Sequence, residues 1–341
     1  MNVDQLITVA NEIVGPAKGV LAADESSPTI KKRFDQINVE STEENRRGYR
    51  EMLFTTPGAE EYIGGVILFE ETLGQSTKDG VPFPKLLAEK GMIPGIKVDK
   101  GAKALAGFPG ETVTEGLDGL RERLNGYREQ GALFAKWRAV IDIDETAGIP
   151  SRFGIEANAH ALARYAALCQ EAGLVPIVEP EVLMDGAHSI EVCQAVTEEV
   201  LVEVYNQLSA HRVLLEGTLL KPNMVIAGKK CPQQASVEEV AHATALTLLR
   251  TVPAAVPGVV FLSGGQSSEE ATANLNAINA MGEFPWEVSF SYGRALQAQP
   301  LQAWGGSADN IDAGKKAFFK RAKLNGLARS GDYNADMEKA A

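Results

Sequence analysis

The sequence predicts a closed (β/α)8 barrel, and three observations lead to this prediction. Eight short apolar runs recur along the 341 residues, and polar residues follow each of them. Helical patterns separate most of these runs, with a spacing of about 30–45 residues that is typical of parallel βα units. No Gly-x-Gly-x-x-Gly motif follows the first run, which makes an open dinucleotide-binding sheet the weaker alternative. Eight repeats in one chain favour the closed barrel.

The apolar runs and the helical patterns define the expected elements in chain order. Strands are expected at residues 19–22, 65–69, 93–98, 133–141, 174–178, 213–220, 259–262 and 288–290. Helical patterns between them include residues 116–130, 157–172, 187–210, 237–251 and 267–280. The segment up to residue 15 predicts an extra N-terminal helix, and the polar segment 330–341 predicts a mobile tail. No linker divides the rest, so we expect one barrel domain over residues 1–329.

The composition indicates a folded protein of the cytoplasm. Hydrophobic residues make up 45% of the chain, which is enough for a large core. The net charge of −12 argues against nucleic acid or an anionic membrane as a partner. No run of about 18 apolar residues is present to span a membrane, and the N-terminus lacks the basic segment of a signal peptide. Cys169, Cys193 and Cys231 show no CxxC spacing and fit reduced thiols.

The segment VLLEGTLLKPN at residues 213–223 places a lysine at the end of an apolar strand. Pro222 has no N–H to donate to a sheet, so the strand should end there and Lys221 is its last side chain. Apolar surroundings disfavour the charged form of an amine, which makes Lys221 a candidate nucleophile for attack on a carbonyl group. The alternative is a lysine that buries its aliphatic stem and keeps its charge in water.

Charged side chains at the other strand ends should meet Lys221, because these ends converge on one face of a barrel. Lys97 and Lys136 follow or lie within two separate strands. A second ammonium group beside Lys221 would favour its neutral, nucleophilic form. Each lysine on its own could instead be part of a structural ion pair.

Three carboxylates at strand ends are candidates for proton transfer. Glu179 and Glu181 are two residues apart and should point to the same side of a strand, where paired carboxylates separate in pKa. Two exposed acidic residues in a loop are the alternative. Asp24 follows the first strand, where it could orient a substrate hydroxyl or cap a helix.

The last two strands carry a candidate anion site. Ser263, Gly264 and Gly265 precede the helical pattern at 267–280, so their N–H groups could surround an anion, although such a segment is often only a turn. Arg294 follows the last strand, in the region where barrels commonly bind phosphate. The histidines suggest no metal site and are better explained as core or surface residues; they are His160, His188, His211 and His242.

Seven motifs together resemble the class I fructose-bisphosphate aldolases. They are VLLEGTLLKPN at 213–223, LAADES at 21–26, GIKVDKG at 95–101, FAKWR at 134–138, PIVEPE at 176–181, FLSGGQ at 261–266 and FSYGR at 290–294. The resemblance covers roughly residues 5–333 in order. It implies a barrel enzyme that reversibly cleaves fructose 1,6-bisphosphate to dihydroxyacetone phosphate and glyceraldehyde 3-phosphate. It also implies that neither a metal nor another cofactor is needed, and that the chain forms a homo-oligomer, a tetramer or a dimer.

The resemblance also implies a role for each matched residue. Lys221 resembles the imine-forming lysine and Glu179 the principal proton shuttle, with Asp24, Lys136 and Glu181 as supporting acid-base and electrostatic residues. The residues that resemble the site for the C1 phosphate are Ser263, Gly264, Gly265, Ser291, Gly293 and Arg294. The residues that resemble groups toward the C6 phosphate are Ser26, Arg33 and Lys97, with Arg46 as a weaker candidate. The division of proton transfer between Asp24 and Glu179 stays open.

Two positions depart from the family's pattern. Pro28 and Thr29 stand in place of a more usual Gly-Ser, and the chain ends at Ala341 without the terminal tyrosine that many members use in proton transfer. A transaldolase-like Schiff-base lyase is a second enzyme hypothesis, but two separate cationic clusters suit a bisphosphate better. A barrel that only binds or scaffolds phosphosugars would require the loss of a site residue. Fructose 1-phosphate and sedoheptulose 1,7-bisphosphate are alternative substrates.

Overall fold

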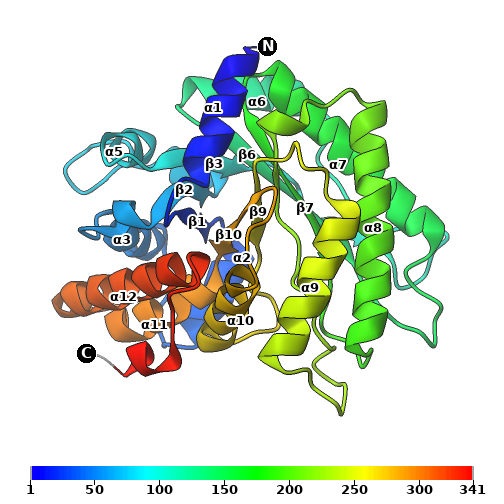
Figure 1. The fold of residues 1–341 in the computed structure, drawn as a ribbon. Coiled ribbons are helices and arrows are strands. Elements are labelled where there is room, and N and C mark those ends of the chain that lie inside the picture. The colour runs from blue at the N-terminus through cyan, green and yellow to red at the C-terminus, as the bar shows by residue number, and fades with distance from the viewer. Residues whose placement is uncertain (1, 340–341) are drawn as a thin grey trace.

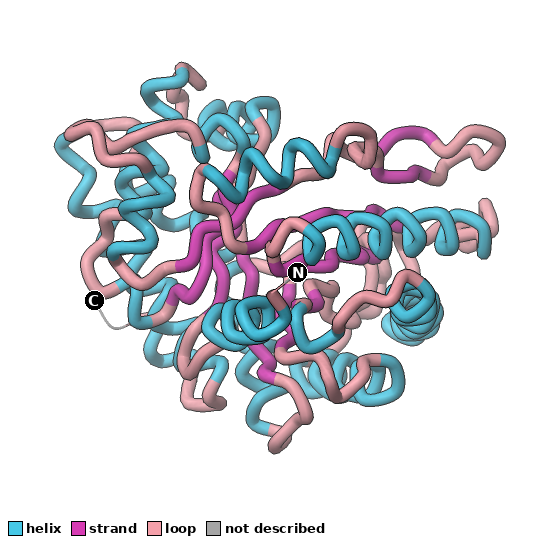
Figure 2. Tube along the Cα trace, turned by 90° about the horizontal axis from the view of Figure 1, so that it is seen from above, coloured by secondary structure: helices cyan, strands magenta, loops and turns pink. Residues whose placement is uncertain are grey.

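The computed structural model describes residues 2–339 and contains a closed barrel of eight parallel strands. In sheet order the strands are β1 (Gly19–Ala23), β10 (Glu287–Tyr292), β9 (Gly258–Phe261), β8 (Leu219–Leu220), β7 (Val175–Val182), β6 (Phe134–Ile141), β3 (Ile93–Lys97) and β2 (Ile63–Leu68). Helices surround these strands (Figures 1 and 2). The predicted (β/α)8 barrel is therefore confirmed, and each of the eight expected segments contributes a strand to the barrel wall.

The helices connect successive strands and cover the outside of the barrel (Figure 1). They are α1 (Val3–Ile13), α2 (Ser27–Asp35), α3 (Glu43–Phe54), α4 (Glu70–Leu73), α5 (Phe83–Glu89), α6 (Leu120–Glu129), α7 (Arg152–Glu171), α8 (Ile190–Ala210), α9 (Val237–Thr251), α10 (Ser268–Ala280), α11 (Arg294–Trp304) and α12 (Ile311–Arg329). Short 3-10 helices are η1 (Ala59–Glu61), η2 (Leu215–Gly217), η3 (Ala308–Asn310) and η4 (Ala335–Glu338). A small antiparallel pair, β4 (Ala102–Ala104) and β5 (Thr112–Thr114), follows β3.

The extra N-terminal helix α1 closes one end of the barrel. Leu6 and Ile13 are buried together with Phe134 and Leu219, which point into the barrel interior. A Cβ atom at Gly64 would lie only 2.2 Å from the carbonyl oxygen of Ile13, so glycine is needed for this close approach. One end of the barrel is thus packed with apolar side chains, and the opposite end, where the strands terminate, is left for the site.

The segment predicted as a strand at 213–220 forms η2 and only a short β8. Its backbone groups bond to the Gln170 side chain, which accepts from the Leu214 N–H at 3.0 Å and donates to the Leu214 carbonyl at 2.7 Å. A distant side chain therefore replaces the sheet hydrogen bonds in the first half of the segment. Lys221 still follows the strand, as expected, and its N–H donates to the Val178 carbonyl at 2.8 Å.

The described part of the predicted tail is anchored to the barrel. Tyr333 is buried, Met337 packs against the core, and Glu338 forms an ion pair with Arg321 of α12 at 2.6 Å. The polar sequence of this segment did not indicate these contacts. The boundary at residue 329 and the mobility of the segment stay predictions, and residues 340 and 341 lie outside the described part of the chain. Within residues 2–339 no helix is both long and apolar enough to cross a membrane.

Candidate active site

A cavity of about 870 Å³ opens at the end of the barrel where the strands terminate. Residues at the ends of β1, β3, β6, β7, β8, β9 and β10 line it. The lining includes these residues predicted from the sequence: Asp24, Ser26, Arg33, Lys97, Lys136, Glu179, Glu181, Lys221, Ser263, Gly264, Gly265, Ser291, Gly293 and Arg294. Arg46 is not among the lining residues. Its guanidinium donates to Glu71 and to the Ser41 carbonyl instead.

A chain of ion pairs crosses the floor of the cavity. The Lys136 Nζ lies 2.7 Å from Asp24 Oδ2 and 3.2 Å from Glu179 Oε2. The second carboxylate oxygen of Glu179, Oε1, lies 3.2 Å from the Lys221 Nζ. The side chains of both lysines and of Glu179 are 5% exposed. Glu179 thus bridges two ammonium groups that come from β6 and from the end of β8.

The ion pairs in this row determine which of their side chains are charged at neutral pH. Burial alone would raise the pKa of Asp24 and of Glu179, but Lys136 and Lys221 outweigh it and lower both. Burial opposes the charged form of Lys136, yet Asp24 and Glu179 raise its pKa well above the ordinary value. At neutral pH the two carboxylates are therefore ionised and Lys136 is an ammonium ion. Asp24 is not a helix cap, because Ser26 occupies the N-cap position of α2.

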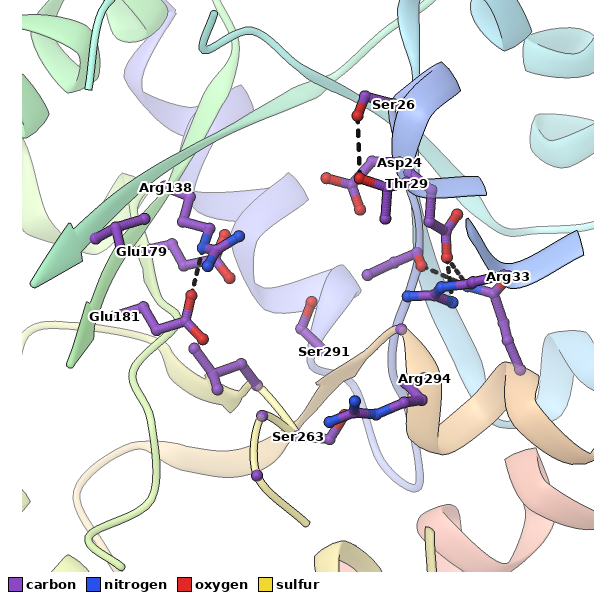
Figure 3. Close-up of a pocket in the computed structure, with 18 of the residues that line it drawn as sticks. Asp24, Ser26, Thr29, Arg33, Arg138, Glu179, Glu181, Ser263, Ser291 and Arg294 are labelled. Atoms are coloured by element: carbon purple, nitrogen blue, oxygen red, sulfur yellow. Dashed lines mark hydrogen bonds and ion pairs between the residues drawn. The ribbon is translucent and has the colours of Figure 1, made fainter. Parts of the chain in front are cut away.

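Glu179 and Glu181 lie on the same side of β7 and differ in pKa, as paired carboxylates should. Burial raises the pKa of Glu181, the Arg138 guanidinium opposes this, and the charge of Glu179 adds to it. Arg138 forms an ion pair with Glu181 (Figure 3). The sequence analysis did not assign Arg138 to the site. Its position two residues after Lys136 on β6 was the available signal, because alternate residues of a strand share one face.

The loop after β9 and the start of α11 form one side of the cavity. A Cβ atom at Gly264 would lie 2.6 Å from Met184 Cε, and one at Gly265 would lie 2.3 Å from Met184 Cγ. Gly265 also has a φ of +81°, so this position requires glycine, whereas the atom nearest to a Cβ at Gly264 is the end of the flexible Met184 side chain. The Ser291 hydroxyl is buried and finds no hydrogen-bond partner among residues 2–339. Arg294, the first residue of α11, extends toward the side of the cavity where Ser263 lies (Figure 3).

A second polar cluster lies at the start of α2. The hydroxyl groups of Ser26 and Thr29 are 3.1 Å apart, and Arg33 forms an ion pair with Glu25 at 2.6 Å (Figure 3). Pro28 stands in the first turn of α2, where proline is well tolerated. The departure from Gly-Ser is thus compatible with the helix start, and Thr29 still presents a hydroxyl group.

The cavity lining also includes charged residues that were not predicted from the sequence. Asp99 forms an ion pair with the predicted Lys97 at 2.9 Å, and Lys229 pairs with Asp185 at 2.6 Å at a more exposed position. Lys32 and Glu25 also contribute to the lining. No grouping of three or more histidine, cysteine, aspartate or glutamate side chains suited to a metal ion occurs within residues 2–339.

Comparisons with known proteins agree on one family. The family model described as "Fructose-bisphosphate aldolase class-I" matches residues 5–341. A "Probable fructose-bisphosphate aldolase class 1" of Xanthomonas campestris pv. campestris is 58% identical over 98% of this chain and 99% of its own length. "Fructose-bisphosphate aldolase 4, cytosolic" of Arabidopsis thaliana is 58% identical over 98% of this chain and 85% of its own length.

A solved structure gives the same result. The fructose-bisphosphate aldolase of Plasmodium falciparum, in complex with TRAP and a small-molecule inhibitor, superposes with a TM-score of 0.96. The two chains are 53% identical, over 97% of this chain and 96% of the other. Together with the closed barrel, these matches confirm the resemblance found in the sequence motifs. The chain belongs to the family of class I fructose-bisphosphate aldolases, metal-independent lyases of glycolysis that act on a sugar phosphate.

Proposed function

We propose that this protein cleaves fructose 1,6-bisphosphate reversibly through an imine formed on Lys221. The observation that supports this most is the buried contact of 3.2 Å between the Lys221 amine and the Glu179 carboxylate. Lys136 and Asp24 extend this contact across the cavity, and polar clusters flank it on two sides. An amine and a proton-transfer group are thus already in contact before a substrate arrives.

The first step forms the imine. A proton passes from the Lys221 ammonium group to Glu179, which leaves a neutral amine and a carboxylic acid in contact. The amine adds to the C2 carbonyl carbon, and a proton then moves from the new C–N ammonium group to the former carbonyl oxygen, which gives a neutral carbinolamine with a hydroxyl group. Glu179 then protonates this hydroxyl, which leaves as water and produces a cationic iminium. Lys136 keeps its positive charge throughout, so it offsets the negative charge of the two carboxylates.

The second step breaks the C3–C4 bond. The C4 hydroxyl gives its proton to Asp24 or to Glu179, the electron pair of the bond moves toward the iminium, and glyceraldehyde 3-phosphate is released. The remaining enamine is protonated at C3, and water then hydrolyses the imine to dihydroxyacetone phosphate and free Lys221. The pKa of Asp24 and that of Glu179 are both lowered, so both carboxylates are ionised at neutral pH and either can accept this proton. Glu181 and Arg138 support Glu179 from the same face of the barrel.

The two polar clusters suit the two phosphates of the substrate. The loop from Ser263 to Gly265 precedes α10, and exposed N–H groups at a helix start bind anions. Ser291, Gly293 and Arg294 complete this cluster, which we assign to the C1 phosphate. We assign the C6 phosphate to the cluster of Ser26, Thr29, Arg33 and Lys97. A transaldolase-like lyase would have no use for a second phosphate cluster. Sedoheptulose 1,7-bisphosphate carries two phosphates as well and is a further candidate substrate.

Other properties follow from the relatives rather than from the site. The Arabidopsis relative is named cytosolic, and we place this protein in the cytoplasm on that ground. We expect it to be a homo-oligomer, a tetramer or a dimer, as the family resemblance suggests. Size-exclusion chromatography with light scattering tests the oligomeric state directly.

The imine mechanism is tested by borohydride reduction in the presence of dihydroxyacetone phosphate. We expect irreversible inactivation, with the label on Lys221 alone after peptide mapping, because reduction traps the iminium. Lys221→Met should abolish the label, while Lys100→Met, which changes a half-exposed lysine outside the cavity, should not. A label on Lys136 or Lys97, or full activity without a label, would contradict the mechanism.

A further inference from the structure

Arg321 of α12 is a fully buried cation whose charge is balanced by the C-terminal turn. Its side chain is 0% exposed, and its Nη1 donates to both carboxylate oxygens of Glu338, at 2.6 and 2.7 Å. Glu338 is the last residue of η4, and the Tyr333 hydroxyl donates to it at 3.1 Å. A buried charge that loses its partner is strongly destabilised. The position of the Arg321 guanidinium therefore depends on Glu338.

The other end of the same guanidinium holds the first turn of α10. Its Nη2 donates to the Ser268 carbonyl oxygen at 3.0 Å and also to the Thr272 hydroxyl. The C-terminal segment contacts α10 directly as well, because the Tyr333 N–H donates to Asn276 Oδ1 at 2.9 Å. Figure 1 shows the C-terminal turn next to α12. One planar cation thus ties the end of the chain to the start of α10.

The start of α10 carries the loop assigned to the C1 phosphate. Ser267 is the N-cap residue, and Glu270 completes a capping box with it. The Asn274 side chain donates to Gln266 Oε1 at 2.8 Å, so the residue after Gly265 is held by the helix itself. Because the loop is short and bonded to the helix, a shift of the first turn moves the loop N–H groups with it.

We propose that Glu338 is a positioning residue for the C1-phosphate site. Through Arg321 it fixes the first turn of α10, and with it the N–H groups of the loop from Ser263 to Gly265. This inference rests on the assignment of that loop to the C1 phosphate. The C-terminal segment then serves the reaction by holding a binding loop in place, and none of its described residues, 330–339, lines the cavity.

The test measures the rate of borohydride trapping at increasing concentrations of dihydroxyacetone phosphate. The half-saturating concentration reports phosphate binding, and the limiting rate reports imine chemistry. Glu338→Gln keeps the shape of the side chain and removes its charge. We expect its half-saturating concentration to rise about tenfold, since small displacements of binding groups have large effects, with a limiting rate within about twofold of the parent.

The matched control is Asp336→Asn, which removes another charge from η4 at a side chain that is 87% exposed. Both parameters should be unchanged in this control. An unchanged half-saturating concentration in a folded Glu338→Gln variant would overturn the proposal, and so would a fall in the limiting rate with no change in half-saturation. Thermal unfolding followed by circular dichroism shows whether the variant is folded.

If Glu338→Gln does not fold, Tyr333→Phe takes its place, because it removes only one donor to Glu338. A rise in half-saturation of about twofold, consistent with one lost hydrogen bond, would then support the proposal, and no rise would overturn it. Trapping measured in the parent protein distinguishes a failure of this proposal from a failure of the imine mechanism on which it rests. Absence of saturable trapping in the parent would refute the imine mechanism, whereas failure of the positioning role appears only in the variants.

Discussion

Lys136 holds together two carboxylates that would otherwise repel each other. Asp24 comes from the end of β1 and Glu179 from β7, and both contact the Lys136 ammonium group on β6. The sequence identified all three as site residues from their positions at strand ends. It could not show that Lys136 bridges them, because their distances depend on how the barrel closes. Lys136 was expected to lie beside Lys221. In the structure Glu179 lies between them and contacts the ammonium groups of both lysines.

Lys136→Met should slow imine formation and change its pH dependence. Without this cation, Glu179 is left with Lys221 as its ion-pair partner, and Asp24 loses the ammonium group that it contacts. The lowered pKa of Glu179 is partly due to Lys136, so it rises in the variant. The carboxylate is then protonated at a higher pH. The loss of trapping rate on the acidic side of the pH profile should therefore begin at a higher pH than in the parent. We expect a loss on the order of a hundredfold, the usual size of an acid-base effect.

The rate of borohydride trapping across a pH series measures this change. Lys100→Met is the matched control, since Lys100 forms an ion pair with Glu70 at 51% exposure and does not line the cavity. A pH profile for Lys136→Met that coincides with the parent's would show that Lys136 has only a structural role.

The barrel strands and the helix α10 were the easiest elements to predict from the sequence. Strands stood out as apolar runs, and α10 (Ser268–Ala280), with Ser267 as its N-cap, matches the expected helix at 267–280. Arg138 was missed because only Lys136 of the motif at 134–138 was given a role, although the two residues share one face of the strand. The 3-10 helix η2 was missed because Gln170, far away in the sequence, supplies its backbone partners. Local pattern reveals an element, but not the distant side chain that alters it.

Arg294→Ala should weaken the binding of dihydroxyacetone phosphate by about 2–3 kcal/mol, as expected for the loss of a charge-assisted contact. Arg294 is the first residue of α11 and lines the cavity near the loop after β9. Titration of the half-saturating concentration in the trapping assay measures the effect. Arg250→Ala, at an exposed ion pair with Glu198, is the control and should bind as the parent does. Unchanged affinity in Arg294→Ala would place the C1-phosphate site elsewhere.

At the scale of the whole molecule, the cavity is locally positive on an acidic protein. The net charge of the chain is −12, yet eight lysine and arginine side chains line the cavity against six carboxylates. The negative surface of the protein repels an anionic substrate, but cations gathered in a cleft attract it locally. The sequence predicted this contrast, because the basic residues at strand ends stood out from the acidic background. The C-terminal segment was harder to predict, since its polar sequence gave no sign that it packs over the buried Arg321.

Tyr333→Phe should leave the limiting rate of fructose 1,6-bisphosphate cleavage within a few-fold of the parent. Tyr333 is the only tyrosine after Arg294 in the sequence and is thus the candidate to replace a terminal tyrosine as proton donor. Its side chain is buried against the core away from the cavity lining, and its hydroxyl is bound to Glu338. Burial and the charge of Glu338 raise its pKa to about 12, which makes it a poor acid at neutral pH. We therefore do not expect Tyr333 to protonate the enamine. Steady-state rates at saturating substrate measure this, and a fall of about a hundredfold with accumulating enamine would identify Tyr333 as the donor after all.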